Sequence, residues 1–495
     1  MYDVLIIGAG VNGCAIAREL SKYRLRIGVI EKCCDLCEGT TKANSCISHA
    51  GYDAREGTLK ARLNVRGNKL LKELSKELSF LYIKCGSLVV CKDKEGLKEL
   101  NILMERGIKN NVSGLRILNA DEVRKMEPNL NDDIYAALYA PDAAIMDGFS
   151  LNYNLGYSAK INGVDFVFDT EVIGIDKTDK GYGLKVVKNP TAGRNNLCDD
   201  FYEARVVINA AGIYADRIHN MISDNPIEIR PRRGEYYVFD DAFGWPVSKV
   251  IFPLPDKMGK GSLLIPLSHG NFMVGPSAED IDDKEDCGTD KDKLEAVKEK
   301  SLSLCSKLPF DMVVRSFSGL RAHVVKNEAA IKNYEGKGAD DFIIGELQDA
   351  PGFIDVAGME SPGLTCAPAT GEYVAEIVVN ILKPQRNDGF IKEYRADMLF
   401  IAADEAMREQ MIKDNPKHGN IICRCCTTTE ADIVNALHAP IPAVTVDGVK
   451  KRCGAGMGRC QGGFCLPRVV DIISRELDIP KNCVTMKGKG SNIIL

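Results

Sequence analysis

The chain has 495 residues, of which 69 are acidic, 64 are basic and 45% are hydrophobic. This length predicts two to four domains, and a net charge of −5 argues against a general nucleic-acid binder. No apolar run is long enough to span a bilayer, and the start lacks the basic segment of a secretory signal, so we expect a cytoplasmic protein that meets a membrane only through a partner.

The first part of the chain has the pattern of a β–α–β unit. Residues 4–7 are a short apolar run that predicts a buried parallel strand. Residues 12–22 then predict a helix, and residues 26–31 predict a second strand. Two parallel strands joined by a helix begin a Rossmann-like α/β fold.

Three glycines stand in the turn between the first strand and the helix. Gly8 permits a tight turn, Gly10 lets the backbone approach a pyrophosphate, and Gly13 lets the helix and strand pack closely. The helix N-terminus then offers N–H groups to phosphate oxygens. Glu31 ends the second strand, where a carboxylate can accept hydrogen bonds from a ribose. These residues predict a dinucleotide site but do not separate NAD from FAD.

The loop that follows is a candidate for the chemistry. Residues 39–53 are rich in small and hydroxyl side chains, which suits a loop wrapped around a cofactor, and they include Ser45 and His49. Histidine is the side chain best suited to take up a proton near neutral pH, so His49 is a candidate general base. Residues 59–78 then predict an amphipathic helix.

The middle of the chain predicts further strands and two substrate-binding cations. The strands are expected over residues 81–91, 165–175, 204–210, 234–240, 262–266, 271–275 and 341–345. Lys260 lies in a glycine-flanked turn, and Arg321 follows a turn of small residues. Arg offers a two-pronged donor to a carboxylate or phosphate and Lys adds a point charge, so both are candidates to bind an anionic substrate.

Two later segments carry a family resemblance. Residues 204–212 are a strand that ends in small residues before Ile213-Tyr214-Ala215-Asp216, and residues 352–358 are a second strand before Glu360-Ser361-Pro362-Gly363-Leu364-Thr365. With the N-terminal unit, they resemble the flavoproteins of the D-amino-acid oxidase and glycerol-3-phosphate dehydrogenase superfamily over roughly residues 1–380. The resemblance implies FAD as cofactor, and a Rossmann-like FAD-binding domain with a mixed-sheet α+β substrate domain.

The resemblance also implies which residues act in catalysis and which contact FAD. The 39–53 segment looks like the Ser-x-x-x-His-x-Gly segment of glycerol-3-phosphate oxidases and L-2-hydroxyglutarate oxidases, which places His49 near the reacting carbon as the base. The segments around Lys260 and Arg321 look like family segments that face the substrate. The implied FAD contacts are Gly8, Gly10, Gly13, Glu31, Thr40, Thr41, Ser45, Val172, Ala211, Gly212, Gly358, Ser361, Gly363, Leu364 and Thr365.

Cysteines gather in the C-terminal part, where residues 423–495 hold seven of the 18. Cys423 and Cys425 are followed by Cys460 and Cys465, so four thiols stand in two close pairs. This pattern suits a [2Fe–2S] cluster or a tetrahedral zinc ion. Residues 420–495 also carry ten Lys and Arg against six Asp and Glu, which predicts a small basic unit on an acidic body.

The same part of the chain resembles the bacterioferritin-associated ferredoxin-type [2Fe–2S] domain. The resemblance implies a [2Fe–2S] cluster held by the four thiols named above. The neighbouring thiols of Cys426 and Cys453 could compete as ligands, and Cys33, Cys34 and Cys37 leave open a second redox site. Locally, Thr427 with Glu430 predicts a capping box that opens a helix, and a second helix is expected from Pro467 to about residue 477.

These patterns divide the chain into expected domains. The oxidoreductase is expected over residues 1–383, followed by a linker over 384–419 that is helical from 397, the [2Fe–2S]-binding domain over 420–480 and a tail over 481–495. Within the oxidoreductase, the FAD-binding parts are expected at about 1–78, 145–225 and 340–383, and the substrate-binding parts at about 79–144 and 226–339.

The expected function is an FAD-dependent dehydrogenase. By resemblance, it oxidises sn-glycerol 3-phosphate to dihydroxyacetone phosphate, with hydride going to flavin N5 and electrons leaving through the cluster to a partner protein. One alternative is an L-2-hydroxyglutarate dehydrogenase or oxidase. The other is an electron-relay subunit of a larger flavoprotein complex. We expect an oligomer or complex, and no nucleic-acid partner.

Overall fold

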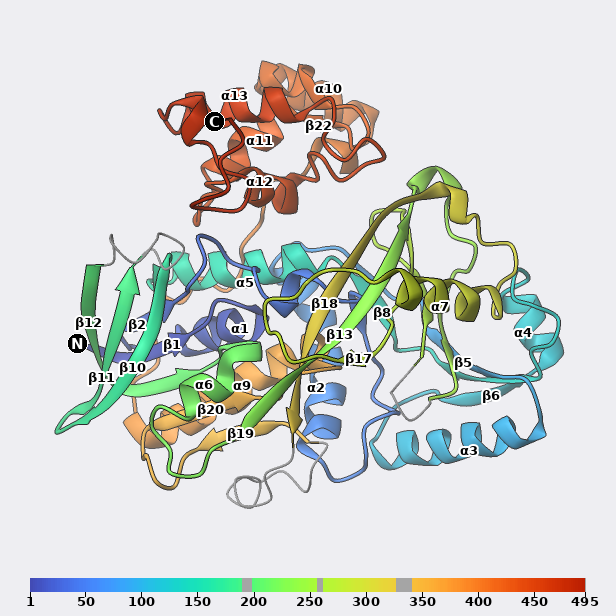
Figure 1. Cartoon of the computed structure of the whole chain (residues 1–495), viewed down its shortest axis with the longest axis horizontal. Coiled ribbons are helices and arrows are strands. Elements are labelled where there is room, and N and C mark those ends of the chain that lie inside the picture. Colours follow the sequence, from blue (N-terminus) through green and yellow to red (C-terminus); the bar gives the residue numbers. More distant parts are fainter. Residues whose placement is uncertain (189–197, 256–260, 326–340, 495) are drawn as a thin grey trace.

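The computed structural model describes residues 1–188, 198–255, 261–325 and 341–494. The chain folds into a body with two large sheets and a small unit at one end of that body (Figure 1). We call this unit, residues 399–494, the C-terminal module. No helix in the described part of the chain is long and apolar enough to cross a membrane.

The first sheet has a parallel centre. Its parallel strands lie in the spatial order β20 (Phe353–Ala357), β12 (Cys198–Asn209), β1 (Tyr2–Ile7), β2 (Ile27–Ile30) and β9 (Asp165–Val167). Antiparallel strands complete it: β10 (Thr170–Thr178), β11 (Gly181–Lys188) and β19 (Ile343–Glu346). Since the parallel strands end at one edge, the turns that follow them meet there.

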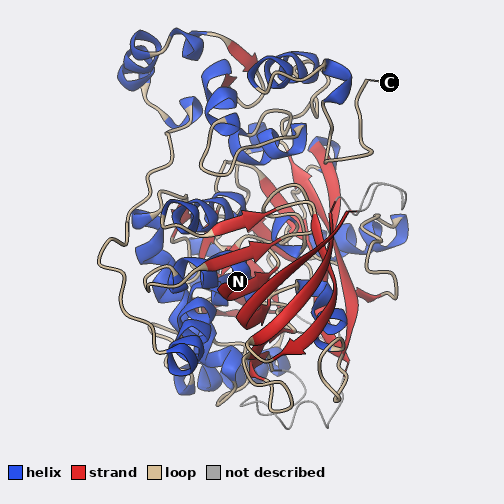
Figure 2. Ribbon diagram, turned by 90° about the vertical axis from the view of Figure 1, so that its left-hand side faces the viewer, coloured by secondary structure: helices blue, strands red, loops and turns tan. Residues whose placement is uncertain are grey.

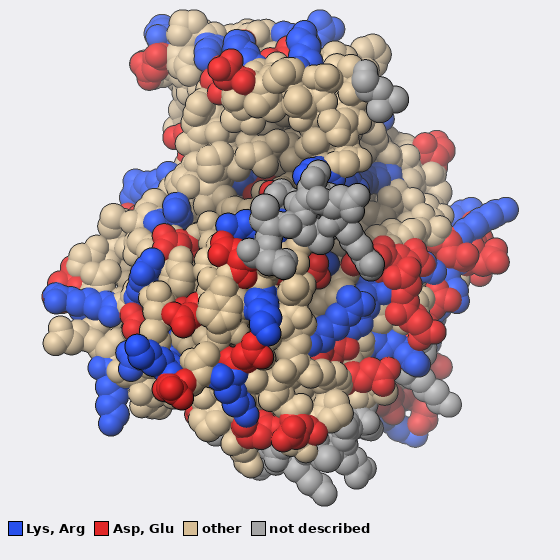
Figure 3. Space-filling view, turned by 60° about the vertical axis from the view of Figure 1, so that its left-hand side comes forward, with Lys and Arg blue, Asp and Glu red and all other residues tan. Residues whose placement is uncertain are grey.

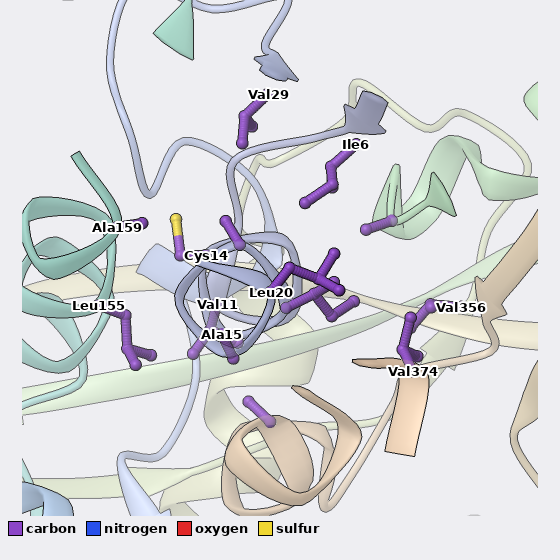
Figure 4. Close-up of a cluster of buried hydrophobic side chains, with 14 of the residues drawn as sticks. Ile6, Val11, Cys14, Ala15, Leu20, Val29, Leu155, Ala159, Val356 and Val374 are labelled. Atoms are coloured by element: carbon purple, nitrogen blue, oxygen red, sulfur yellow. The ribbon is translucent and has the colours of Figure 1, made fainter. Parts of the chain in front are cut away.

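Helices cover this sheet and bury its apolar side chains. They are α1 (Val11–Leu20), α2 (Leu59–Glu77), α5 (Gly148–Ile161), α6 (Ala215–His219) and α9 (Gly363–Leu382). Helix α1 lies between α5 and α9, and Figure 4 shows Leu155 of α5 and Val374 of α9 on either side of it. Ile6 and Val29 of the sheet are fully buried against α1. Each such side chain contributes about 1.5–3 kcal/mol of hydrophobic stabilisation.

The second sheet is mostly antiparallel, with one parallel pair. Its strands are β5 (Ser87–Cys91), β6 (Arg116–Asn119), β7 (Ala136–Ala140), β13 (Glu228–Phe239), β14 (Val250–Pro253), β15 (Leu263–Pro266), β16 (Phe272–Gly275), β17 (Glu279–Asp280) and β18 (Val313–Val325). The surrounding helices are α3 (Lys94–Lys109), α4 (Ala120–Met126) and α7 (Lys291–Leu302). A third sheet combines β3 (Ile47–Ser48), β4 (Tyr82–Ile83) and β8 (Ala144–Met146).

The C-terminal module is mainly helical (Figure 2) and has its own hydrophobic core. It contains α10 (Glu405–Asp414), α11 (Glu430–Leu437), α12 (Val446–Cys453), α13 (Leu466–Glu476) and the short hairpin of β21 (Ile421–Cys423) and β22 (Thr428–Thr429). Ile433, Val449 and Ile473, one from each of α11, α12 and α13, are fully buried together. The predicted fold class, an α/β body with a mixed second sheet and a small helical C-terminal unit, is confirmed.

Several local predictions were wrong. The strand expected over 165–175 is broken at Asp169, which has a left-handed φ of 51°. The strand over 81–91 is broken before Gly86, with φ 78°. In the segment 397–419, the α-helix covers only Glu405–Asp414.

The predicted capping box is also displaced along the chain. It forms between Thr429 and Asp432 rather than between Thr427 and Glu430. Thr427 has a left-handed φ of 48°, so it turns the chain into the helix and cannot cap it.

A buried histidine ties β20 to α6. His219 Nδ1 lies 2.6 Å from Asp355 Oδ2, and His219 Nε2 lies 2.8 Å from the carbonyl oxygen of Asn225. Acceptors at both nitrogens favour the doubly protonated ring. Burial lowers the pKa of His219, but the hydrogen bond and charge of Asp355 outweigh it and raise the pKa above its usual value.

We expect this pair to make stability depend on pH. A raised folded-state pKa gives stabilisation that is complete below the unfolded histidine pKa of about 6.5 and is lost as pH rises through the folded-state value. Urea unfolding of wild type and His219→Gln should therefore show that wild type loses more stability between pH 6 and pH 9. Parallel pH profiles of the two proteins would contradict this assignment.

Candidate functional site

The glycine-rich turn joins β1 to α1 at the edge where the parallel strands end. A Cβ on Gly13 would lie 2.0 Å from the carbonyl oxygen of Gly8, and a Cβ on Gly8 would lie 2.5 Å from that of Ala210. Gly8 also has a φ of 106°, which disfavours other residues. Only glycine fits at these two positions, and the fit brings the N-terminus of α1 to the strand edge, where its N–H groups attract phosphate.

Glu31 lies beside this turn. Its Oε2 accepts a hydrogen bond of 2.7 Å from the Ala9 N–H, and its Oε1 accepts one of 2.9 Å from the Cys33 N–H. Burial raises the pKa of Glu31, and the two N–H donors only partly offset this. Each carboxylate oxygen keeps a lone pair that can accept a ribose hydroxyl. Asn12 Oδ1 is buried in the same turn, with no hydrogen-bond partner among the described residues, so it too can accept from a ligand.

The loop after β2 connects the turn to the second sheet. Thr41 Oγ1 accepts a hydrogen bond of 3.1 Å from the Val11 N–H, and Thr40 Oγ1 donates one of 2.7 Å to the carbonyl oxygen of Leu320 in β18. A Cβ on Gly10 would lie 3.2 Å from Thr41 Oγ1, so the loop lies directly over the glycine turn. Ser45 is partly buried in the same loop.

The remaining predicted cofactor residues lie near the same edge. Ala211 follows β12, and its Cα would lie 3.3 Å from a Cβ on Gly8. A Cβ on Gly212 would meet open space, since no described atom lies within 4 Å of it. Val172 is buried in β10, two residues after Thr170, whose N–H donates to the carbonyl oxygen of Glu31 at 3.0 Å.

The segment before α9 joins the loop that carries His49. Gly358, Ser361, Gly363 and Leu364 lead into α9, which no side chain caps at its N-terminus. Thr365 Oγ1 accepts a hydrogen bond of 3.0 Å from the His49 N–H and donates one of 3.1 Å to the carbonyl oxygen of Ile47. The structure therefore brings together the first turn of α9 and residues 47–49, which are more than 300 positions apart in the chain.

Arg321 lies on β18 beside a buried tyrosine. Its guanidinium donates to the backbone carbonyl oxygens of Arg232 at 3.4 Å and Ser277 at 3.2 Å, and it makes no ion pair with a carboxylate in the described part of the chain. Burial lowers the pKa of Arg321 from its usual range. The ring of Tyr236 stacks on Phe317 at a centroid distance of 4.9 Å, and burial raises the pKa of Tyr236 to about 12, against the opposing charge of Arg321. A cation with only carbonyl partners can bind an anion.

His49 and Arg321 lie against one group of side chains. The His49 ring lies 5.8 Å from the ring of Phe252 in β14, and Phe252 shares a buried cluster with Tyr236. A Cβ on Gly319 would lie 1.9 Å from the carbonyl oxygen of Ala43, so the face of β18 that carries Arg321 lies against the loop over residues 39–46. Lys260 lies outside the described residues.

Two residues of this site were missed in the sequence. Tyr236 is paired with Phe317 across β13 and β18, and only the register between these strands shows that it shares a face with Arg321. Glu360 Oε2 lies 3.2 Å from His323 Nδ1, and Glu360 Oε1 lies 3.5 Å from Lys60 Nζ. Burial alone would raise the pKa of Glu360, but His323 and Lys60 lower it to about 2. Glu360 stands directly before Ser361, a predicted FAD contact, and this position was the one sign in the sequence that Glu360 belongs to the site.

The four predicted ligand cysteines lie together in the module. Cys425 Sγ and Cys460 Sγ are 3.8 Å apart. Two metal–sulfur bonds of about 2.3 Å at a tetrahedral centre separate their sulfurs by about the same distance. The hydrogen bond from Cys426 and the N–H of Gly456 lower the pKa of Cys423 to about 5, and Cys465 contributes a further hydrogen bond. These thiols suit a cluster that takes two thiolates on each iron.

Other features of the module bear on this ligand set. No group of three or more His, Cys, Asp or Glu side chains in the described ranges is arranged to hold a single metal ion. Cys453 Sγ donates to the carbonyl oxygen of Val449 at 3.2 Å, so its thiol lies against its own helix. A Cβ on Gly458 would lie 3.4 Å from the sulfurs of both Cys425 and Cys426, so Cys426 borders the group.

The comparisons with known proteins agree with both parts of the chain. Residues 3–377 match the family model described as FAD dependent oxidoreductase, and residues 421–475 match the BFD-like [2Fe-2S] binding domain. The glycerol 3-phosphate dehydrogenase of Caloramator mitchellensis is 44% identical over 495 residues, which cover 100% of this chain and 98% of the relative.

Two further proteins are similar to the body. The solved structure of dithionite-reduced L-alpha-glycerophosphate oxidase from Mycoplasma pneumoniae, with FAD bound, is 31% identical with a TM-score of 0.72, and the match covers 80% of this chain and 99% of that one. The mitochondrial L-2-hydroxyglutarate dehydrogenase of Arabidopsis thaliana is 28% identical over 408 residues, which cover 75% of this chain and 82% of the relative.

Proposed function

Because the chain belongs to the FAD dependent oxidoreductase family and carries a BFD-like [2Fe–2S] binding domain, we propose that it oxidises sn-glycerol 3-phosphate to dihydroxyacetone phosphate. FAD and a [2Fe–2S] cluster are its cofactors. The proposal rests above all on Arg321, a partly buried cation with only carbonyl partners beside Tyr236. Similarity over the whole length to a glycerol 3-phosphate dehydrogenase supports this substrate.

The residues at the strand edge fit the cofactor. When bound, FAD supplies a hydride acceptor at N5, and the cluster supplies a one-electron carrier. Gly10 and the N-terminus of α1 would hold the pyrophosphate, and Glu31 would accept from the ribose. Cys423, Cys425, Cys460 and Cys465 would hold the cluster. We propose as final acceptor a partner protein that takes one electron at a time.

The chain's own side chains would position the substrate and move its proton. Arg321 holds the phosphate group, with Lys260 as a second cation. His49 takes the proton of the C2 hydroxyl as the hydride leaves C2. Two hydrogen bonds that hold the His49 backbone support this role: its N–H donates to Thr365, and its carbonyl oxygen accepts a 2.7 Å hydrogen bond from Asn64 Nδ2.

An anaerobic titration tests the proposal. Glycerol 3-phosphate should bleach the flavin absorption. About one equivalent of dihydroxyacetone phosphate should form for the two electrons held by each flavin, and about half an equivalent more for the single electron held by each cluster. Glycerol has the same reacting carbon without the phosphate and is the matched control, which should bleach the flavin only at far higher concentration. Bleaching by L-2-hydroxyglutarate in place of glycerol 3-phosphate would overturn the substrate. Bleaching by none of the three would overturn the dehydrogenase assignment in favour of an electron-relay subunit.

Replacing Arg321 with methionine should weaken substrate binding. Loss of one partner of a desolvated charge pair costs about 2 kcal/mol or more, which corresponds to a KM for glycerol 3-phosphate raised about 30-fold or more. Arg315→Met changes an exposed arginine on the same strand and should leave KM within about two-fold, as surface changes usually do. Steady-state kinetics would measure both. An unchanged KM in Arg321→Met would remove Arg321 from the phosphate site.

A further inference from the structure

A buried ion pair joins the C-terminal module to the body. The Arg452 guanidinium on α12 donates to both carboxylate oxygens of Asp35, at 2.6 and 2.8 Å. Its Nε donates to Tyr157 Oη at 2.7 Å, and its central carbon lies 4.0 Å from the centre of the Tyr153 ring. The side chain of Asp35 is 0% exposed and that of Arg452 is 6% exposed, so this contact excludes water.

The neighbouring lysine makes a parallel contact. Lys451 forms an ion pair with Glu38, and these side chains are 3% and 8% exposed. Glu38 also lies 3.0 Å from Lys42 Nζ. A third ion pair joins the module to the second sheet: Arg459 lies 3.0 Å from Asp240, which directly follows β13, in a more exposed position. In the space-filling view the module sits directly on the body, and charged atoms of both signs lie along the junction (Figure 3).

The partners of Arg452 and Lys451 belong to the loop that carries predicted FAD contacts. Asp35 and Glu38 lie between Glu31 and the residues Thr40, Thr41 and Ser45. This loop therefore contacts the module through Asp35 and Glu38, and contacts the glycine turn through Thr41. Residues 384–398, which lead to the module, contain no helix and only one isolated β-bridge, at Arg386. The backbone of this segment is hydrogen-bonded to the body as far as Tyr394, whose N–H donates to the carbonyl oxygen of Glu77 at 3.0 Å, so residues 395–398 form the link between the anchored segment and the module.

We propose that Asp35 and Arg452 are a positioning pair that fixes the [2Fe–2S] module in one orientation on the FAD-binding loop. The effect of this pair on electron transfer between the two cofactors rests on the proposed function, whereas the docked arrangement itself does not. A docked module keeps one separation between the two cofactor sites, and a module tethered only by its linker would not. The planar fork of Arg452 suits this role because it matches a carboxylate at both oxygens and stacks on Tyr153. Removing one partner would leave the other charge buried and unpaired, so the docked state would be lost.

The experiment uses the full chain with both cofactors and compares Arg452→Met with Arg475→Met. Arg475 is a matched control on the same module, because it is 52% exposed and pairs with Glu430 and Glu476, which both belong to the module. The first readout is the rate of trypsin cleavage within residues 384–398, which reports docking without any redox step. The second readout starts from photoreduction of the flavin by a light flash with EDTA as electron donor, and follows the [2Fe–2S] signal by absorption and EPR.

Arg452→Met should speed linker cleavage about ten-fold or more, since cleavage follows the population of the undocked state. It should slow cluster reduction about ten-fold or more, since small displacements of a positioned group have large kinetic effects. Flavin content and flavin bleaching by glycerol 3-phosphate should stay within about two-fold of wild type. Arg475→Met should match wild type in every readout. Because the flash does not use the substrate, a failure of glycerol 3-phosphate to bleach the flavin would count against the proposed function alone.

Two further variants cover the case in which Arg452→Met does not fold. Arg452→Lys keeps the charge but loses the fork, and should give intermediate cleavage and reduction rates. Asp35→Asn removes the charge from the other side of the contact and should give the same two effects as Arg452→Met. Wild-type cleavage rates in Asp35→Asn and Arg452→Lys would overturn the docking claim. Faster cleavage with an unchanged rate of cluster reduction would overturn the positioning role.

Discussion

Replacing His49 with alanine is expected to lower kcat for glycerol 3-phosphate oxidation about 10²–10⁴-fold, the usual contribution of a positioned general base. The FAD content should stay at the wild-type level. We expect this difference between kcat and FAD content because the His49 backbone can keep its hydrogen bonds to Thr365 and Asn64 when the ring is removed. Stopped-flow bleaching of the flavin under anaerobic conditions measures the affected step directly.

A second histidine provides the control for this prediction. His438 is 57% exposed on the module, where its Nε2 lies 3.0 Å from Glu476 Oε2. His438→Ala should leave flavin bleaching within about two-fold of wild type, as expected for a surface position. If bleaching in His49→Ala stayed within a few-fold of wild type, the base would have to be another group. Loss of FAD from that variant would instead show that His49 has a structural role.

Replacing Cys460 with serine is expected to remove the [2Fe–2S] cluster. The cluster needs four thiolates, and the Cys460 sulfur lies 3.8 Å from that of Cys425, so the substitution takes away one of two paired ligands. Iron content should fall from about two atoms per chain to well below one, with loss of the EPR signal of the reduced cluster. Flavin bleaching by substrate should persist, because the glycine turn and Glu31 lie in the body.

Cys483 is the matched control on the same module. It is exposed and is not among the four predicted ligands, so Cys483→Ser should keep the full iron content. An intact cluster in Cys460→Ser would mean that another thiol is a ligand. Cys426 is the candidate for that outcome, because it borders the group near Gly458, whereas the Cys453 thiol lies against its own helix.

Short-range patterns in the sequence predicted the parts of the site that depend on neighbouring residues. Gly13 is required by the carbonyl oxygen of Gly8 in the same β–α turn, and Gly8 by its own φ of 106°. Cys423 and Cys425 lie two positions apart in the chain, so spacing alone was informative. The same reasoning misplaced the capping box by two residues. The triplet Thr427-Thr428-Thr429 offers several equivalent caps, and the choice depends on the left-handed turn at Thr427.

Contacts between residues far apart in the chain could not be predicted from the sequence. Tyr236 shares a face with Arg321 only because β13 pairs with β18 in one register, and a shift of one residue would turn it to the other face. The Asp35–Arg452 pair joins positions 417 residues apart, and neither residue belongs to a motif. Sequence patterns also treated Cys453 and Cys426 alike, although the helix around Cys453 turns its thiol to a backbone carbonyl.

The spatial order of the first sheet constrains how the protein is made. Strand β1 is paired on one side with β2 and on the other with β12, and β12 in turn pairs with β20, so the edge that holds the glycine turn is complete only when residues near both ends of the body are present. During synthesis, more than 300 residues must follow the His49 loop before Thr365 is made and can form its hydrogen bond to this loop. The module emerges last and docks on a segment that was synthesised among the first. A nascent chain that stops before β20 therefore leaves the edge of β12 over residues 207–209 unpaired, and an unpaired strand edge can associate with other chains.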